Sequence, residues 1–279
     1  MGRIKTFILM LVLILIFMEV GNLIGGAEGM KIAFWMAVAM NFFSYFFSDK
    51  IVLKQYKAQE VNAKGAPELY DIVRRLSEKA GLPMPKVYII NEKVPNAFAT
   101  GRNPSHAAVA ATTGLLELMN KQEVEGVLAH EMSHVKHYDI LTSSVAAVFA
   151  GAISMIGNMA RYNNNTSRSN NRQNGLFAIV GVILMPIAAS IIRFAISRTR
   201  EYAADAGSAK LTGHPEWLIS ALSKLEGYSK QAQMKNATNE TAHMFIINPF
   251  SGANLSALFS THPATKDRIE RLENMTREL

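Results

Sequence analysis

Two histidines four residues apart, His130 and His134, enclose a glutamate in the sequence His-Glu-Met-Ser-His. Residues with this spacing lie on one face of a helix. Two imidazoles on that face can reach a single zinc ion at about 2.0–2.1 Å. Glu131 stands beside them, and zinc lowers the pKa of a water molecule that it binds to about 7. The pattern therefore predicts zinc-assisted hydrolysis with Glu131 as general base, whereas the simpler alternative is a pair of surface histidines.

A zinc hydrolase with two histidine ligands needs a third protein ligand. The position six residues after His134, where one large class of metallopeptidases has histidine, is Ile140. Glu201 in Arg-Glu-Tyr-Ala-Ala-Asp is the favoured third ligand, and Asp205 follows it by one helical turn. A membrane hairpin between His134 and Glu201 would return the chain to the surface that it left. The competing interpretations are that Glu201 is a solvated helix charge, or that the ligand is another histidine: His106, His137, His214, His243 or His262.

The segment that carries the two histidines has the features of a helix. Asn120 and Glu123 have the spacing of a capping box, in which each side chain accepts a hydrogen bond from the other residue's backbone N–H. Apolar residues at helical spacing follow, so a helix is predicted over residues 121–138. A second helix is predicted from Pro67 to Ala80, with Gly81 at its C-terminal end.

Short β-branched and alanine-rich stretches predict three strands, over residues 87–90, 96–100 and 107–112. Further helices are predicted over residues 198–211, 215–227 and 263–279. Helices combined with a few short strands indicate an α+β fold, a small zincin-like catalytic domain of helices and a small β-sheet. The asparagine at the start of the second strand, Asn96, together with Ala97 and Phe98, is a candidate edge for pairing with an extended substrate.

The composition of the 279-residue chain points to lipid, because 49% of the residues are hydrophobic and only 18% are charged. Four apolar runs, residues 6–24, 32–48, 140–160 and 174–192, approach the length of about 20 residues that a membrane-spanning helix needs. About four transmembrane helices are therefore predicted in a mainly helical integral membrane protein. The alternative is that some of these runs are buried core helices. There is no cysteine, which excludes a thiolate ligand or nucleophile.

Four crossings would divide the chain into four parts: two transmembrane helices in 1–48, the first part of the catalytic domain in 49–139, a membrane-associated hairpin in 140–192, and the second part of the catalytic domain in 193–279. Both termini and both catalytic segments would share one side. Most lysines and arginines next to the runs lie on that side, which places it in the cytoplasm. The net charge of +7 then favours anionic lipid headgroups as partners and argues against nucleic acid.

Four separated motifs together resemble the HtpX family of bacterial inner-membrane zinc metalloproteases, which is related to the CAAX prenyl endoproteases. The motifs are Asn-Ala-Phe-Ala-Thr-Gly from Asn96, His-Glu-Met-Ser-His from His130, Arg-Glu-Tyr-Ala-Ala-Asp from Arg200 and His-Pro-Ala-Thr from His262. One departure is Ala264, where a second proline is expected. The resemblance implies a gluzincin that carries one Zn²⁺ per chain on His130, His134 and Glu201. It also implies ATP-independent cleavage of membrane proteins at the cytoplasmic face, as quality control under stress.

Other residues receive roles from physical reasoning. Asp205 is positioned in the sequence to orient a ligating imidazole, and His262 to donate a hydrogen bond to the oxyanion of the reaction. The predicted function is thus a zinc endoprotease that acts on misfolded membrane proteins. The alternative is a catalytically idle scaffold of the same fold, against which Glu131 argues, because a scaffold has no need of that carboxylate. A channel or transporter is disfavoured because Glu19 is the one acidic residue within the four apolar runs.

Overall fold

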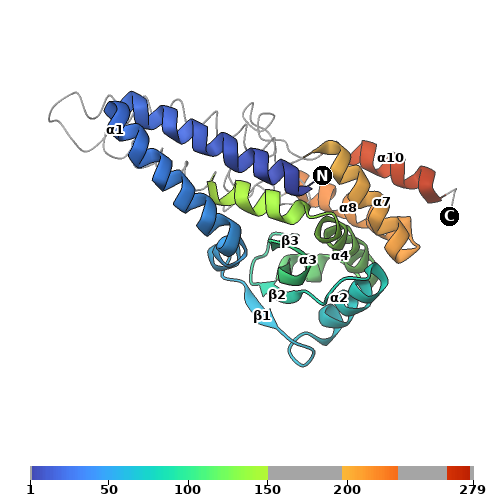
Figure 1. Cartoon of the computed structure of the whole chain (residues 1–279). Coiled ribbons are helices and arrows are strands. Elements are labelled where there is room, and N and C mark those ends of the chain that lie inside the picture. The colour runs from blue at the N-terminus through green and yellow to red at the C-terminus, as the bar shows by residue number, and fades with distance from the viewer. Residues whose placement is uncertain (1, 150–196, 232–262, 277–279) are drawn as a thin grey trace.

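The computed structural model describes residues 2–149, 197–231 and 263–276. The chain begins with α1 (Gly2–Gln55), a long helix that reverses direction at Gly25 and Gly26. Gly26 has φ +60° and ψ −148°, a conformation open essentially only to glycine. The bend turns α1 into two helical arms that project away from the rest of the molecule (Figure 1).

The two arms of α1, Ile4–Leu23 and Gly25–Gln55, are long and apolar enough to cross a membrane. Large apolar side chains cover their outer surface, among them Phe7 and Trp35, each 68% exposed. A water-soluble surface rarely leaves such a continuous apolar area uncovered. Two of the four predicted spans therefore have the properties of membrane helices.

The third apolar run is described as far as Phe149, as the apolar helix Asp139–Phe149. Its side chains pack between the two arms of α1, where Leu141, Val145 and Phe149 meet Leu9 and Leu13. Thr6 and Thr142 join their hydroxyl groups across this contact at 2.7 Å. The fourth run, residues 174–192, lies outside the described residues, so the number of four spans stays a prediction.

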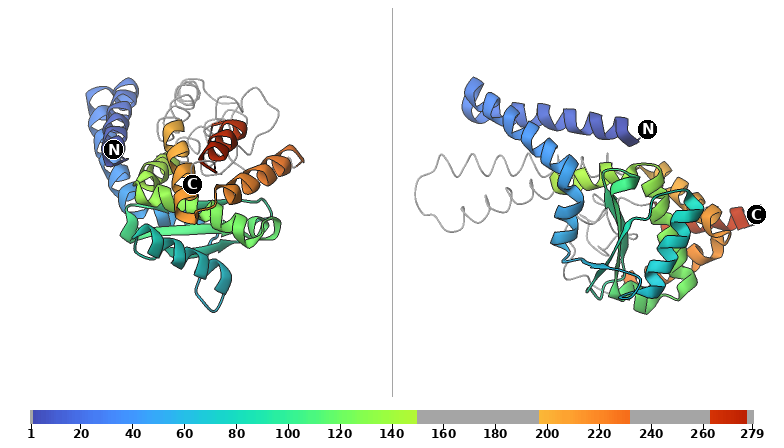
Figure 2. Two further views of the ribbon diagram at one scale, coloured as in Figure 1. Left: turned by 90° about the vertical axis from the view of Figure 1, so that its right-hand side faces the viewer. Right: turned by 60° about the horizontal axis from the view of Figure 1, so that its bottom comes forward.

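The predicted small sheet has four strands in the order β1 (Gln59–Val61), β2 (Lys86–Ile90), β4 (Ala107–Thr112) and β3 (Ala97–Gly101). β2 and β4 are parallel, and the other two pairs are antiparallel. Three of these strands match the predicted ones. The sheet is seen nearly edge-on in the right-hand view of Figure 2, with helices on both sides.

Both faces of the sheet are buried, which explains why β3 and β4 are rich in alanine. Ala97, Ala99 and Val109 face the main core beneath α2 (Pro67–Ala80) and α4 (Lys121–Lys136). Phe98 and Ala110 face the opposite way, toward the end of α1 and the Asp139–Phe149 helix. The sheet thus forms the layer between the apolar arms and the remaining helices.

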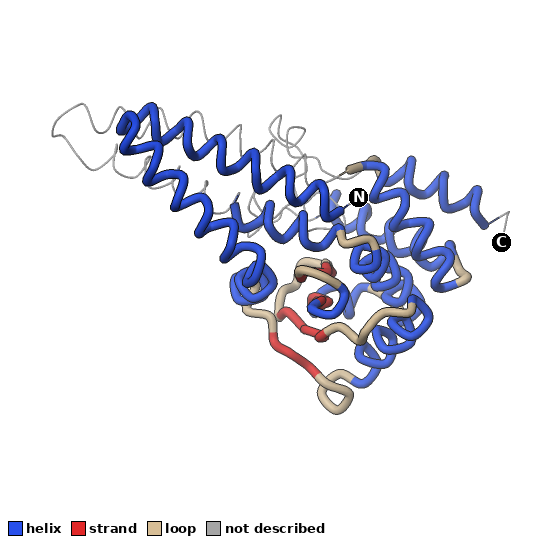
Figure 3. The backbone as a smooth tube through the Cα atoms, in the orientation of Figure 1, coloured by secondary structure: helices blue, strands red, loops and turns tan. Residues whose placement is uncertain are grey.

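The remaining helices complete a mainly helical molecule (Figure 3). They are the short α3 (Thr113–Leu118), then α7 (Arg198–Thr212), α8 (Pro215–Gln231) and α10 (Thr265–Thr276). The helices predicted over 198–211 and 215–227 match α7 and α8, and the predicted C-terminal helix matches α10. The last three pack with α4 around one core. This packing places α7, which follows residues 150–196, directly against α4.

Candidate metal centre

The histidine pair lies in the last turns of α4, whose start is fixed as the sequence predicts. Asn120 Oδ1 accepts a hydrogen bond from the Glu123 N–H, and the Glu123 carboxylate accepts one from the Asn120 N–H. The helix is buried along most of its length, and His130 is only 2% exposed. A buried helix holds its side chains in fixed rotamers, so the two imidazoles are presented in one defined geometry.

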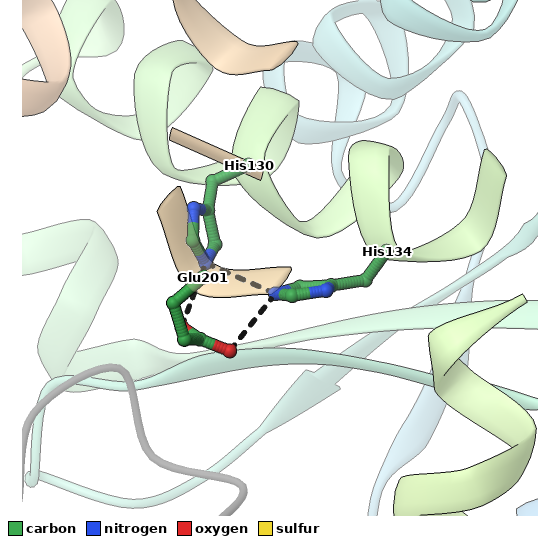
Figure 4. Close-up of side chains that lie close together, drawn as sticks. All are labelled: His130, His134 and Glu201. Carbon is green, nitrogen blue, oxygen red and sulfur yellow. Dashed lines mark hydrogen bonds and ion pairs between the residues drawn. The ribbon is translucent and has the colours of Figure 1, made fainter. Parts of the chain in front are cut away.

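The structure brings Glu201 from α7 against the two histidines (Figure 4). The Nε2 atoms of His130 and His134 are 3.2 Å apart. Glu201 Oε2 lies 3.6 Å from His130 Nε2, and Glu201 Oε1 lies 3.5 Å from His134 Nε2. The donor atoms of a tetrahedral zinc site, with bonds of about 2.0–2.1 Å, are separated by ~3.3 Å. The three donors therefore fit a single metal ion.

None of the other candidate histidines within the described residues takes part. His106 contacts Asn103, and His214 contacts Glu216 on the exposed surface. His137 is exposed at the end of α4. His243 and His262 lie outside the described residues, so the predicted oxyanion donor His262 cannot be placed.

Asp205 lies beneath His130, one turn beyond Glu201 on α7. Its Oδ1 is 2.9 Å from His130 Nδ1, which turns the other ring nitrogen toward Glu201. The cationic partner of Asp205 is Arg268 of α10. Arg268 donates to Asp205 through Nε at 2.9 Å and Nη2 at 2.6 Å. Arg268 is fully buried, so this is a charge pair enclosed in the core.

The buried charges shift each pKa of the site in the direction that favours the charged form of the group: the histidine pKa values rise and the aspartate pKa falls. Burial lowers the pKa of His130, but Asp205 and Glu201 outweigh it and raise that pKa to about 9. Burial lowers the pKa of His134, yet Glu201 and Asp139 raise it on balance. Burial raises the pKa of Asp205, whereas Arg268 and His130 bring it down to about 2. The carboxylates thus create a negative potential that favours a cation between the two rings.

Glu131 faces strand β3. Its Oε2 accepts a hydrogen bond of 3.0 Å from the Ala99 N–H. Asn96 and Thr112 are joined through the Asn96 carbonyl and the Thr112 N–H, so alternate residues of β3 bond to β4. The backbone groups of Ala97, Ala99 and Gly101 consequently point outward, away from the sheet. Among the described residues β3 is an edge strand, so the general-base candidate is held at the outer edge of the sheet.

The three residues predicted to form the substrate edge differ in how they are oriented: two are buried within the sheet, and one directs its peptide groups outward. Phe98 is buried on the far face of the sheet against Tyr56, with ring centroids 5.4 Å apart. Asn96 is buried and joined to Thr112 through its backbone. Of the three residues predicted to form the substrate edge, Ala97 alone has its peptide groups directed outward.

Sequence reasoning missed Asp139. Asp139 Oδ2 lies 3.4 Å from His134 Nδ1, although five residues along one helix would put the two side chains on different faces. The chain breaks helix α4 at His137 and Tyr138, and Tyr138 has φ +63°. No residue type in this segment signals that break, because a tyrosine rarely adopts a positive φ.

Together, the buried His-Glu-x-x-His helix and the facing glutamate on a second helix define a metallopeptidase-type centre. The comparisons agree: the profile of peptidase family M48 matches residues 63–276. The chain belongs to this family and to its HtpX group, which confirms the resemblance seen in the sequence. "Protease HtpX homolog" of Campylobacter hominis is 63% identical over 282 residues, covering 100% of both chains. The protein of the same name from Sulfurovum sp. is 53% identical, covering 98% of this chain and 99% of that one.

The fold is also similar to a solved structure, the crystal structure of S. mikatae Ste24p. The TM-score is 0.54 at 19% sequence identity, and the similarity covers 93% of this chain. This chain spans 61% of the length of that protein. At this identity the similarity shows the shared fold alone.

Proposed function

We propose that this protein is a zinc-dependent endopeptidase that hydrolyses peptide bonds of misfolded membrane proteins at the cytoplasmic face of the inner membrane. The observation that carries this proposal is the convergence of His130, His134 and Glu201 beside Glu131 and the outer edge of β3. This arrangement supports a single site that contains the proposed metal ligands, the proposed general base and the proposed substrate edge. Membership of peptidase family M48 supports the same reaction class.

The donor set favours zinc over harder cations. Two imidazoles and one carboxylate are typical zinc ligands, whereas calcium and magnesium prefer oxygen donors alone. Zinc bound here would supply Lewis acidity that polarises the scissile carbonyl group. Asp205 and Asp139 each face the Nδ1 atom of one histidine, so both Nε2 atoms are available to the ion.

Glu131 is proposed to move the proton of the reaction. Its carboxylate accepts a proton from the attacking water as the water oxygen bonds to the peptide carbon. It then gives that proton to the amide nitrogen as the C–N bond breaks. The products are an amine and a carboxylic acid, which carries the second proton of the water until it ionises. The Ala99 N–H fixes the carboxylate beside the metal ligands while it waits for substrate. General catalysis of this kind contributes about 10²–10⁴-fold to the rate.

The substrate is proposed to bind as an additional strand along β3. The outward peptide groups of Ala97 and Gly101 and the outward carbonyl of Ala99 offer donors and acceptors to an extended backbone, whereas the Ala99 N–H is bonded to Glu131. Phe98 and Asn96 would support this edge from within the sheet rather than by touching the substrate. His262, in the His-Pro-Ala-Thr motif, is proposed as the donor to the oxyanion.

The membrane assignment rests on the apolar arms of α1 and on the surrounding charge. The basic residues near the arms favour a cytoplasmic catalytic domain next to anionic headgroups. An active site fixed beside the bilayer would act on segments of membrane proteins that emerge from it. Stress-related quality control follows as the proposed cellular role.

Replacement of Glu131 by glutamine tests the proposal against the scaffold alternative. We expect the variant to bind one zinc ion per chain but to cleave an unfolded protein substrate at least ~10²-fold more slowly than the parent. Glu125→Gln, on the same helix but paired with Arg75 away from the site, serves as the control. Cleavage by Glu131→Gln at the parent rate would show that the assigned mechanism is wrong.

A further inference from the structure

If α4 continued as a regular helix, the Asp139 side chain would point away from the metal centre. Instead it lies next to His134. The positive φ of Tyr138 separates α4 from the following helix and turns Asp139 back toward His134. A non-glycine residue in this conformation costs about 1–3 kcal/mol, so the surrounding structure must enforce it. The turn is held by hydrogen bonds from the His137 N–H to the Ser133 carbonyl and from the Tyr138 N–H to the Val135 carbonyl.

The second carboxylate oxygen of Asp139 is also engaged. Oδ1 lies 3.5 Å from Nε of Arg200, which belongs to the first turn of α7 and directly precedes Glu201. Both side chains are largely buried, at 16% and 21% exposed. A carboxylate held between a guanidinium and an imidazole keeps a defined orientation.

The two histidines therefore have matching surroundings built from different elements. His130 contacts Asp205, and Asp205 in turn contacts Arg268 of α10. His134 contacts Asp139, and Asp139 in turn contacts Arg200 of α7. In both arrangements a carboxylate faces Nδ1, so Nε2 points to Glu201. The second arrangement joins Asp139, which precedes the segment 150–196, to Arg200, which follows it.

We propose that Asp139 is a positioning residue for His134, and that Arg200 positions Asp139. This inference rests on the proposed zinc site and adds to it a partner for the second imidazole. Outer partners of metal-bound histidines typically contribute 10–100-fold to metal affinity. Asp139 would act through ring orientation, and neither Asp139 nor Arg200 would touch the substrate or the ion.

The test uses the full-length protein in detergent, in the Glu131→Gln background so that self-cleavage cannot interfere. Zinc affinity is measured by competition with a chromophoric chelator, and site geometry by the visible absorption of bound Co²⁺. We expect Asp139→Asn to weaken zinc binding about 10–100-fold and to change the Co²⁺ spectrum. Thermal unfolding of the metal-free protein should change little. Asp139→Glu, which keeps the carboxylate, should restore much of the parent spectrum.

Arginine variants test the second half of the inference without touching a residue next to His134. Arg200→Gln should weaken zinc binding at least ~3-fold, whereas Arg198→Gln, an exposed arginine on the same helix, should match the parent. In the double variant Asp139→Asn/Arg200→Gln the loss should equal that of Asp139→Asn alone, because Arg200 acts through Asp139. The comparison of Arg200→Gln with Arg198→Gln also decides the case if Asp139→Asn does not fold.

Failure of the inference and failure of the proposed function give different results. If the parent binds zinc and His130→Ala does not, but Asp139→Asn and Arg200→Gln both bind it as tightly as the parent, the positioning role is wrong. If the parent and His130→Ala bind zinc equally poorly, the proposed zinc site itself is wrong, and the role of Asp139 is overturned with it.

Discussion

At the scale of single residues, the site depends on charges that are buried in pairs. Arg268 is 1% exposed and carries the only guanidinium that contacts Asp205 among the described residues. Asp205 in turn contacts His130. Loss of either partner would leave the other charge in the core without compensation, which is far more costly than loss of a surface pair.

Replacement of Arg268 by glutamine should therefore destabilise the metal-free protein by about 3–5 kcal/mol. The measurement is the thermal unfolding midpoint in detergent. Lys266→Gln, an exposed change on the same helix, should leave the midpoint nearly unchanged. Equal midpoints for the two variants would show that the buried pair does not stabilise the fold.

Residue types and spacing predicted the cluster of His130, His134 and Glu201 but not everything around it. His130, Glu131 and His134 could be recognised from the sequence because residues one helical turn apart lie on the same face and can act on one ion. Glu201 required the further argument that a hairpin returns the chain to the same surface. Asp139 could not be predicted, because its position depends on the backbone angle of Tyr138. The contact between Glu131 and Ala99 depends on the tertiary packing of α4 on β3, which no local pattern encodes.

At the scale of elements, the close approach of α4 and α7 decides whether the third ligand meets the histidines. The helices touch where Gly207 lies over Ser133. A Cβ atom on Gly207 would come within 2.8 Å of Ser133 Cβ. Only a residue without a side chain lets α7 lie this close to α4. Gly207 therefore controls the position of Glu201.

Gly207→Ala should push α7 away from α4, weaken zinc binding and lower stability by about 1–3 kcal/mol. Chelator competition and thermal unfolding measure the two effects. Gly227→Ala in α8, where a Cβ would meet no atom within 4 Å, is the matched control. Ser133→Gly, added to Gly207→Ala, should recover zinc binding by clearing the space. A double variant as weak as the single one would contradict this explanation.

The start of α4 gives a pH-dependent prediction. Burial raises the pKa of Glu123, but hydrogen bonds from Lys224, Ser220 and the Asn120 N–H outweigh it and lower the pKa below 4.5. A carboxyl group whose pKa is lowered by folding stabilises the protein above its unfolded pKa. This contribution is lost as the pH falls through the folded pKa.

Glu123→Gln should accordingly lower the free energy of unfolding by about 1–2 kcal/mol at pH 7. The difference from the parent should shrink as the pH falls through the lowered pKa of Glu123, because the carboxylate then becomes protonated in the parent. Thermal unfolding at several pH values checks this, with Glu117→Gln as an exposed control. A difference that stays constant from pH 7 to pH 3 would show that the charge of Glu123 is not involved.

The elements themselves were largely predictable. The capping box, Gly81 at the end of α2 and the strand-forming stretches are local signals, and the structure confirms all of them. The order of the strands was not predictable. The crossover that places β4 between β2 and β3 depends on both faces of the sheet being buried, by α2 and α4 on one side and α1 on the other.

At the scale of the whole molecule, the sheet separates two environments. The C-terminal end of α1 and the Asp139–Phe149 helix lie against one face of the sheet, and the metal-centre helices lie against the other (Figure 2). Thr100 Oγ1 and Ser144 Oγ connect the sheet to the Asp139–Phe149 helix at 2.7 Å. The metal centre is thus mounted rigidly relative to the apolar arms.

The absence of cysteine makes the orientation in the membrane directly measurable. A single cysteine in place of Glu28, at the exposed tip of the α1 arms, should react with an impermeant maleimide on intact inner membranes. A cysteine in place of Lys64, at the exposed turn before α2, should react only after the membrane is opened. The reverse pattern would place the metal centre outside the cytoplasm and refute that part of the proposed function.

The outward edge of β3 has a consequence for the choice of client. A helix or a finished sheet has already satisfied its own peptide groups, and thus offers nothing that can pair with Ala97, Ala99 and Gly101. A native membrane protein would have to give up much of its stability, about 5–15 kcal/mol for a typical domain, to release such a stretch. Damaged chains release it spontaneously. The edge strand would therefore discriminate by conformational state rather than by sequence, and intact neighbours in the same bilayer would escape degradation without any separate recognition signal.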